Sequence, residues 1–187
     1  MGRGDPESDL AIPSWGLMFL RSAKNTAFDV PGENIEAAMT YVNRCQDTDG
    51  AYFYGIIPNG RTASRSMMGS GILALGLGGR HESAIAKRGV DWLLQHPFRR
   101  YHETFGMRDR FHYAAFYCSQ AMMQLGGKYW QEFYPTLTRT LIAGQESDGS
   151  WPLEPWVNDH RFGDCYTASL AVLALTPPYQ LIPIFQR

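Results

Sequence analysis

The sequence is poor in cysteine, in long apolar runs and in excess charge of either sign. Its cysteines, Cys45, Cys118 and Cys165, are odd in number and form no Cys-x-x-Cys pair, which argues against a disulfide framework and a sequence-local zinc finger. We expect free, mostly buried thiols, a state compatible with the cytoplasm, although the sequence assigns no compartment. No apolar run reaches the roughly 18 residues of a membrane span, and the polar, acidic start is unlike a signal peptide. We therefore expect a soluble chain without a transmembrane segment.

The charge balance excludes further classes of partner. The 17 basic and 18 acidic residues leave a net charge of −1, which gives no argument for a nucleic-acid partner.

The sequence gives little support for β-strands, because the segments rich in Gly, Pro and Asp lack alternating apolar residues. With 187 residues, 44% of them hydrophobic, the chain is long enough for one sizeable core. We predict a flexible tail over residues 1–9 and a single all-α domain over residues 10–187.

Repetition is what the sequence has in abundance. Leu75, Leu125 and Leu175 recur at intervals of about 50 residues, and each lies near the end of an apolar run that stops at Gly or Pro. Such residues end helices. An earlier run over residues 14–25 looks like a fourth member. Three more polar segments between the runs have the apolar spacing of amphipathic helices: residues 32–46, 83–95 and 129–144.

This alternation predicts how the helices are layered. Helices that are apolar all round must be shielded on every side, whereas amphipathic helices need cover on one side only. We therefore predict four inner and three outer helices that form a curved array of helical hairpins.

Two turns in this array are near-copies of one another, "CQDTDGAYF" from Cys45 and "GQESDGSWP" from Gly144. In each, a glutamine ends an outer helix, Asp-Gly follows, and an aromatic residue stands two positions after the glycine. Asp-Gly supplies a tight turn with positive φ, and the glutamine amide can bond unpaired backbone groups at a helix end. The repeated positions are Gln46, Gly50 and Tyr52 in the first copy, Gln145, Gly149 and Trp151 in the second, and Trp92 in a half copy where Pro97 replaces the glutamine.

These turns resemble the "QW" repeats of squalene and other triterpene cyclases. From about Ser14 onward the chain resembles the prenyltransferase and squalene-oxidase repeat superfamily, which contains terpenoid cyclases and protein prenyltransferases. Residues 173–187 are similar to the end of uncharacterised bacterial squalene-cyclase-like repeat proteins. The resemblance implies an α/α toroid, and because complete toroids of this superfamily contain more hairpins, it implies an incomplete ring or part of a larger chain. It implies no single activity, because the superfamily also includes thioester-containing domains and proteins of unknown role.

The catalytic motifs of these relatives are missing or incomplete. The Asp-x-Asp-Asp acid of class II terpene cyclases and the Cys-Gly-Glu-Gln of thioester domains do not occur. Asp164-Cys165-Tyr166 resembles the zinc-binding Asp-x-Cys-Tyr of protein prenyltransferases with one residue deleted, and no His follows it. Asp164 and Cys165 are therefore weak metal candidates. We expect Asp164 to be a helix N-cap and Cys165 a buried thiol, and we predict no metal and no cofactor.

Aromatic and polar residues gather where the third inner helix is expected to begin. His112, Tyr113 and Tyr117 belong to that helix, and a rim loop over residues 154–164 contributes Trp156 and His160. Tyr166 completes the set of ligand-binding candidates. Aromatic walls at the mouth of a curved array suit an isoprenoid or steroid-like ligand. Plain core packing, a hydrogen-bonded structural histidine and a salt-bridged loop remain open as alternatives.

Two hypotheses on function follow. The first is a non-catalytic toroid that binds an apolar, isoprenoid-like ligand or a protein partner. The alternative is part of a terpene cyclase or prenyltransferase-type enzyme whose catalytic motif lies outside this chain, so whether it is an enzyme stays open. The missing acid motif favours the first. Because an arc cut from a ring exposes apolar helix faces at both ends, we also expect self-association or contact with the remainder of a toroid.

Overall fold

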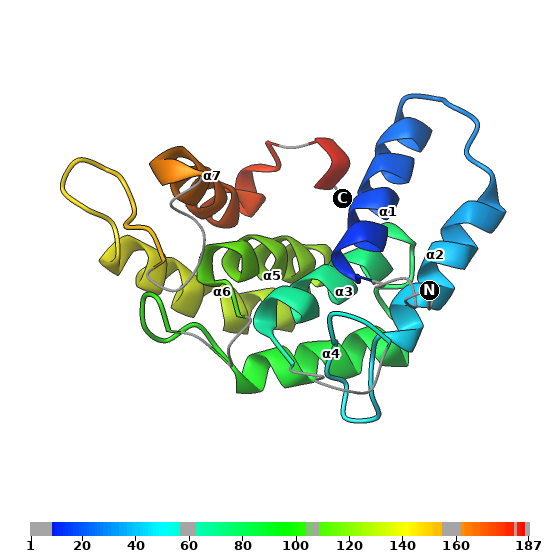
Figure 1. The fold of residues 1–187 in the computed structure, drawn as a ribbon, viewed down its shortest axis with the longest axis horizontal. Helices are drawn as coiled ribbons and strands as arrows, with labels where there is room; N and C mark the ends of the chain where they lie inside the picture. Colours follow the sequence, from blue (N-terminus) through cyan, green and yellow to red (C-terminus); the bar gives the residue numbers. More distant parts are fainter. Residues whose placement is uncertain are drawn as a thin grey trace, which may run out of the picture.

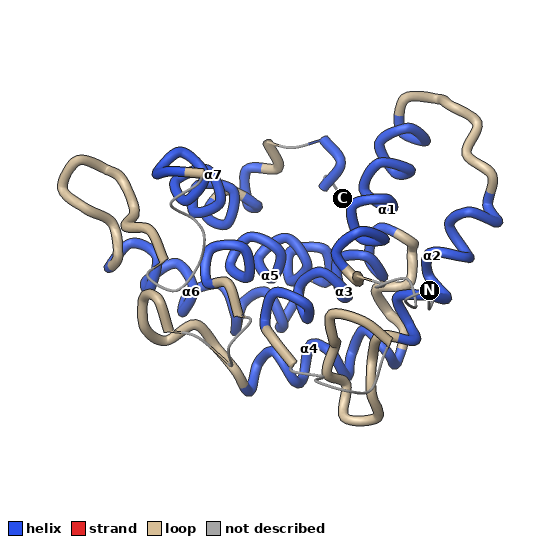
Figure 2. The backbone as a smooth tube through the Cα atoms, viewed as in Figure 1, coloured by secondary structure: helices blue, strands red, loops and turns tan. Residues whose placement is uncertain are grey.

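The computed structural model describes residues 9–56, 63–103, 105, 109–154, 162–181 and 183–185, and these residues are all-α (Figures 1 and 2). They contain no strand, only an isolated antiparallel bridge between Gln46 and Tyr52. This confirms the predicted fold class. The helices in chain order are α1 (Ala11–Asn25), α2 (Gly32–Arg44), α3 (Arg65–Leu77), α4 (Ala84–Gln95), α5 (Phe111–Leu125), α6 (Gly127–Ala143) and α7 (Gly163–Leu175), followed by the short 3-10 helices η2 (Pro177–Tyr179) and η3 (Pro183–Phe185).

The helices begin and end at the residues that the local chemistry favours. Ser64 and Ser83 cap α3 and α4 by accepting hydrogen bonds from backbone N–H groups in the first turn. Gly126 ends α5 with a φ of 66°, and Pro177 follows the end of α7. None of the described helices is both long and apolar enough to cross a membrane.

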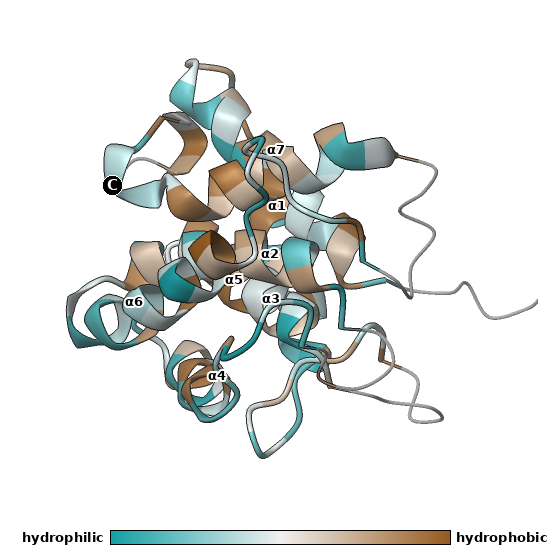
Figure 3. Ribbon diagram, turned by 90° about the vertical axis from the view of Figure 1, so that its left-hand side faces the viewer, coloured by the Kyte–Doolittle hydropathy of each residue, from teal (hydrophilic) through white to brown (hydrophobic). Residues whose placement is uncertain are grey.

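The helices differ sharply in how much of their surface is buried. In α3 every residue except Gly76 is buried, and α5 is buried over most of its length. By contrast, α2, α4 and α6 bury a single face each. Along the chain α1 contacts α3, α3 contacts α5 and α5 contacts α7. The outer helix α4 contacts α3, and α6 contacts α5; in Figure 3, α4 lies below α3, and α6 lies to the left of α5.

The close packing of α3 depends on its small residues. A Cβ atom on Gly69 would lie 2.7 Å from the backbone carbon of Tyr117 in α5, and one on Gly71 would lie 2.6 Å from the Tyr52 ring. A larger residue at either position would force the neighbouring element away. The small-residue-rich character of this helix is therefore a packing requirement.

A buried ion pair fixes the start of α3 to the segment that precedes α5. The side chains of Arg65 and Asp109 are 2% and 0% exposed, and their charged groups lie 2.7 Å apart. Asp109 also accepts hydrogen bonds from the backbone N–H groups of Arg65 and Phe105, each at 2.9 Å. The Arg65 guanidinium lies 4.1 Å from the centre of the Phe98 ring. These additional partners offset the desolvation of the two buried charges.

The segment after α7 returns to the first helix. The 3-10 helix η3 contacts α1, and Phe185 is buried against Phe116 of α5, with ring centres 6.2 Å apart. Its carbonyl accepts a hydrogen bond from the Gln124 side chain. In Figure 1 this segment, coloured red, runs from α7 to the side of α1. Elements from both ends of the described chain therefore meet.

The predicted N-terminal tail lies outside the described residues apart from Asp9. One carboxylate oxygen of Asp9 accepts a hydrogen bond from the Ala11 N–H at 2.7 Å, and the other accepts one from the Tyr54 hydroxyl. Asp9 therefore satisfies a backbone donor in the first turn of α1 and connects that helix to the segment after the first repeated turn.

Candidate functional site

The two repeated turns share one geometry. In the first, the Gln46 side-chain amide donates to the Gly50 carbonyl at 3.0 Å, and in the second Gln145 donates to the Gly149 carbonyl at 2.9 Å. The glycines have φ values of 92° and 87°, which L-residues rarely adopt. The similarity in sequence thus corresponds to the same hydrogen bond and the same backbone conformation.

The surroundings of the two turns are different. Gln46 also donates to the Ile85 carbonyl of α4 at 3.0 Å, and a Cβ atom on Gly50 would lie 2.7 Å from the Arg88 carbonyl oxygen of the same helix. At Gly149 the nearest atom to such a Cβ is the Gln145 amide nitrogen of its own turn, at 4.0 Å. The first turn is therefore pressed against α4, whereas the second is exposed.

The aromatic residue of each turn is a buried plug. Tyr52 is 0% and Trp151 4% exposed. The Trp151 indole N–H donates at 2.8 Å to the Leu141 carbonyl in the last turn of α6, so the tryptophan satisfies a helix-end carbonyl. The expectation that the glutamines do this is wrong, because their amides bond the turn glycine. In the half copy, Trp92 stacks on His96 with ring centres 3.9 Å apart.

His112 lies in a buried polar network at the start of α5. The residue is 0% exposed, with Nε2 2.8 Å from the Tyr101 hydroxyl and Nδ1 3.1 Å from a Glu154 carboxylate oxygen. Glu154 also accepts hydrogen bonds from the N–H groups of Phe111 and His112, both at 2.8 Å, so it caps the helix with a negative charge where the dipole favours one. Both ring nitrogens of His112 are used within the fold, which leaves none for a substrate.

The pKa values in this network follow from burial and hydrogen bonding. Burial alone would raise the pKa of Glu154, but hydrogen bonds from His112 and from the start of α5 hold that pKa below its ordinary value. Burial lowers the pKa of His102, and the neighbouring His112 lowers it further. Burial and the charge of Glu154 raise the pKa of the Tyr101 hydroxyl. Tyr101 therefore stays protonated at neutral pH and is not an activated nucleophile.

The other aromatic candidates lie beside α1 and α7. Tyr117 is fully buried, its ring centre 4.6 Å from that of the half-buried Tyr113 and 6.2 Å from that of Trp15 in α1. Tyr166, in α7, packs with its ring centre 5.3 Å from that of Phe162. Burial raises the pKa of Tyr117, with contributions from Tyr113 and Tyr166. The structure thus groups three of the predicted tyrosines. The predicted Trp156 and His160 lie outside the described residues.

The expectations for Asp164 and Cys165 need correction. Because α7 begins at Gly163, Asp164 lies within the first turn, and Phe162 occupies the N-cap position without a side-chain hydrogen bond. Cys165 is exposed, whereas Cys45 and Cys118 are buried. Buried residues of α7 begin at Thr167, so Cys165 points away from the packed face. The described residues contain no group of three or more His, Cys, Asp or Glu side chains placed to hold a metal ion.

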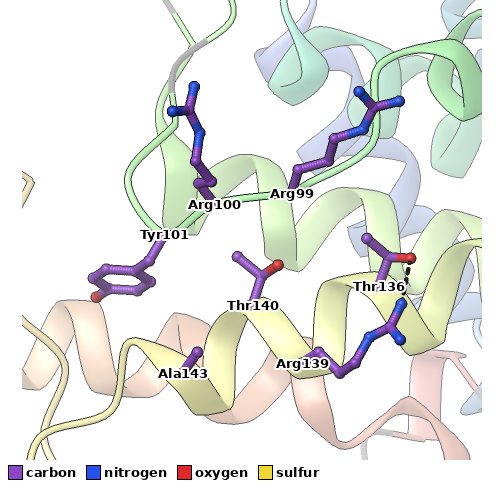
Figure 4. A pocket seen from close by; sticks show the side chains of 7 residues that line it. All are labelled: Arg99, Arg100, Tyr101, Thr136, Arg139, Thr140 and Ala143. Carbon is purple, nitrogen blue, oxygen red and sulfur yellow. Dashed lines mark hydrogen bonds between the residues drawn. The ribbon is translucent and has the colours of Figure 1, made fainter.

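Sequence reasoning missed a pocket between the loop that follows α4 and helix α6 (Figure 4). Its volume is about 690 Å³. Tyr101, whose hydroxyl contacts His112, also lines this pocket. The adjacent pair Arg99 and Arg100 is visible in the sequence, but Arg139 of α6, which lines the same pocket, is distant from it in the chain. Thr136, Arg139 and Thr140 of α6 also line the pocket.

No protein-family model matches this chain, and no curated protein or solved structure shows significant similarity to it. The resemblance to terpenoid cyclases and prenyltransferases therefore stays a prediction.

Proposed function

We propose that this chain is a non-catalytic helical-repeat domain of the α/α-toroid type, with four inner and three outer helices, that binds a second copy of itself through exposed apolar helix faces. The layering is supported by the consecutive contacts of α1, α3, α5 and α7 and by the single buried face of α2, α4 and α6. On this reading the described helices form an arc, and α1 and α7 lie at its two ends.

The exposed face of α1 is the observation that carries the proposal. Ile12, Trp15 and Phe19 are 68%, 52% and 70% exposed, and their spacing of three and four residues places them on one side of the helix. At the other end of the row of inner helices, Phe162, just before α7, is 58% exposed and Val172, within α7, is 46% exposed. Contact between α7 of one copy and α1 of the next would continue the series of inner helices and cover apolar surface at both ends.

The polar network supports a role without catalysis. His112, one of the predicted ligand-binding residues, has both ring nitrogens occupied and is 0% exposed. The carboxylate oxygens of its partner Glu154 accept hydrogen bonds from backbone N–H groups at the start of α5. A general base must reach the proton that it removes, and here neither group is accessible to a substrate.

Self-association is tested with two phenylalanines that match in exposure. Phe19 on α1 and Phe28 in the loop after it are both 70% exposed, so changing either to serine leaves the core intact. Burying a phenylalanine side chain contributes about 1.5–3 kcal/mol. Phe19→Ser should therefore raise the dimer dissociation constant at least about tenfold, while Phe28→Ser should leave it unchanged.

Sedimentation velocity over a concentration series measures the dissociation constant of the wild type and both variants. Circular dichroism confirms that each variant keeps its helix content. A wild type that stays a compact monomer at micromolar concentrations contradicts the proposal. Equal weakening by Phe19→Ser and Phe28→Ser would mean that the α1 face is not the contact surface.

An apolar small molecule is the second candidate, favoured by the aromatic group of Trp15, Tyr113 and Tyr117. Aromatic walls suit an isoprenoid-like ligand. Titration with an isoprenoid alcohol such as farnesol, followed by tryptophan fluorescence, should show saturable binding that Tyr113→Ala weakens. Unsaturable, non-specific uptake in both proteins would exclude this candidate.

A further inference from the structure

The pocket beside α6 gathers positive charge from two distant parts of the chain. Arg99 and Arg100 belong to the loop that follows α4, and Arg139 belongs to α6. In the view of Figure 4 the loop arginines and Arg139 lie at opposite edges of the pocket, with Thr136 and Thr140 between them. All three arginines line a space of about 690 Å³.

Most of this charge is unpaired within the described part of the chain. The Arg99 side chain forms no hydrogen bond or ion pair there, and Arg139 forms a single hydrogen bond, to the Thr136 hydroxyl at 3.3 Å. Among the described residues, the Glu103 carboxylate lies 3.4 Å from the Arg100 guanidinium and accepts a hydrogen bond from the Arg99 backbone N–H at 3.3 Å. The buried Arg65, in contrast, is fully engaged with Asp109. Like charges that share one pocket repel one another unless an anion lies between them.

The loop that holds two of these arginines is fixed before any ligand arrives. The Phe98 carbonyl accepts a hydrogen bond from the Thr140 hydroxyl at 2.7 Å, and the Tyr101 hydroxyl donates to the Pro152 carbonyl at 3.1 Å. The Tyr101 ring also packs where a side chain at Gly144 would have to lie. Arg99 and Arg100 are thus held between two anchored residues, which reduces the ordering cost of binding.

We propose that this pocket binds a small molecule carrying two phosphate groups, one contacted by the loop arginines and the other by Arg139 and Thr136. Guanidinium groups match phosphate oxygens in pairs, and the Thr136 hydroxyl, which accepts from Arg139, still has its own proton to donate to the anion. Volumes of about 300–1,000 Å³ are typical of small-ligand sites, and a single inorganic phosphate contacts only one edge of such a space. This site is separate from the α1 face and independent of self-association.

The test compares ligands that differ by one phosphate. Isothermal titration calorimetry with fructose 1,6-bisphosphate, fructose 6-phosphate and inorganic phosphate, at constant ionic strength, measures three dissociation constants. We expect the bisphosphate to bind at least about tenfold more tightly than the monophosphate, the ratio that one charge-assisted contact supplies. Inorganic phosphate should bind no more tightly than the monophosphate.

The variants remove one edge of the pocket at a time. Arg139→Gln and Arg99→Gln should each abolish the advantage of the bisphosphate and leave monophosphate binding nearly unchanged. Arg21→Gln, at an exposed arginine on α1, is the matched control and should behave as the wild type. Circular dichroism verifies the fold of each variant.

Three results would overturn the proposal. They are an absence of heat with any ligand at millimolar concentration, equal affinity for the two sugar phosphates, and equal losses in Arg139→Gln and Arg21→Gln. The last would mean that the phosphates respond to overall charge rather than to this pocket.

Discussion

The glycines of the two repeated turns share a backbone conformation but differ in their surroundings. Gly50 and Gly149 have nearly the same φ, 92° and 87°, and each accepts the same hydrogen bond from a glutamine side chain. They differ in their neighbours, because only Gly50 is in contact with another helix. Replacing each with alanine therefore separates the cost of the backbone conformation from the cost of the contact with α4.

The geometry of each turn sets the expected loss of unfolding free energy. Positive φ costs an L-residue roughly 1–2 kcal/mol, and Gly149→Ala should lower the free energy of unfolding by about that amount. At Gly50 the new Cβ atom would lie 2.7 Å from the Arg88 carbonyl oxygen, so turn and helix must separate. Overpacking of this kind adds about 1–3 kcal/mol. Gly50→Ala should therefore cost about twice as much as Gly149→Ala.

Urea denaturation of the wild type and both variants, followed by circular dichroism, measures the difference. Gly79→Ala supplies a third value, since Gly79 has a φ of 77° and open space around its Cβ position, and it should match Gly149→Ala. If Gly50→Ala and Gly149→Ala are equally destabilising, the first turn is not pressed against α4 and the reasoning fails.

Further predictions concern the buried polar groups and the thiols. Asp109→Ala leaves its buried arginine partner unpaired and should cost about 3–5 kcal/mol in urea denaturation; a loss below about 1 kcal/mol would contradict the described burial. Trp151→Phe keeps the ring but removes the donor to the end of α6, so it should cost about 1–2 kcal/mol, and an unchanged midpoint would disprove the hydrogen bond's role. The pKa of Glu154 is lower in the folded state than its ordinary value of 4.5 and that of His102 is lower than 6.5, so the unfolded state binds these protons more tightly. Stability should be full above about pH 6.5 and fall on acidification, first through His102 and then, below about pH 4.5, through Glu154; Glu154→Gln should flatten the second step of a pH series of denaturation curves, and an unaltered slope there would refute the assignment. Native protein should expose one fast-reacting thiol to a thiol reagent, and Cys165→Ser should abolish that reaction without changing stability, whereas a second fast thiol would contradict the burial of the other cysteines.

The helices could be predicted because their signals are local. Ser83, Gly126 and Pro177 act on the turn next to them, and the apolar spacing of each segment repeats within a few residues. The positive φ of Gly50 and Gly149 was equally predictable, since an Asp-Gly pair forms a tight turn by itself. A signal confined to neighbouring residues requires no knowledge of the rest of the fold.

The candidate site was less predictable because its contacts join distant residues. The sequence placed His112 at a helix start, but its partner Glu154 follows one hairpin later. Arg99 and Arg139 line one pocket although α5 and the start of α6 lie between them in the chain. The exposure of Cys165 depended on the phase of α7, which Gly163 sets by starting the helix with a φ of 67°. A shift of one residue rotates a helical side chain by about 100°, which is enough to turn a core position outward.

The return of η3 to α1 changes how the molecule is expected to come apart. A row of helices in which each contacts only its neighbours can fray from either end, one unit at a time. Here Phe185 packs on α5 and η3 contacts α1, so elements far apart in the chain must separate together. Phe185→Ala should turn a single sharp unfolding transition into a broader one. In hydrogen exchange, the amide protons of α7 should then exchange before those of α3 and α5.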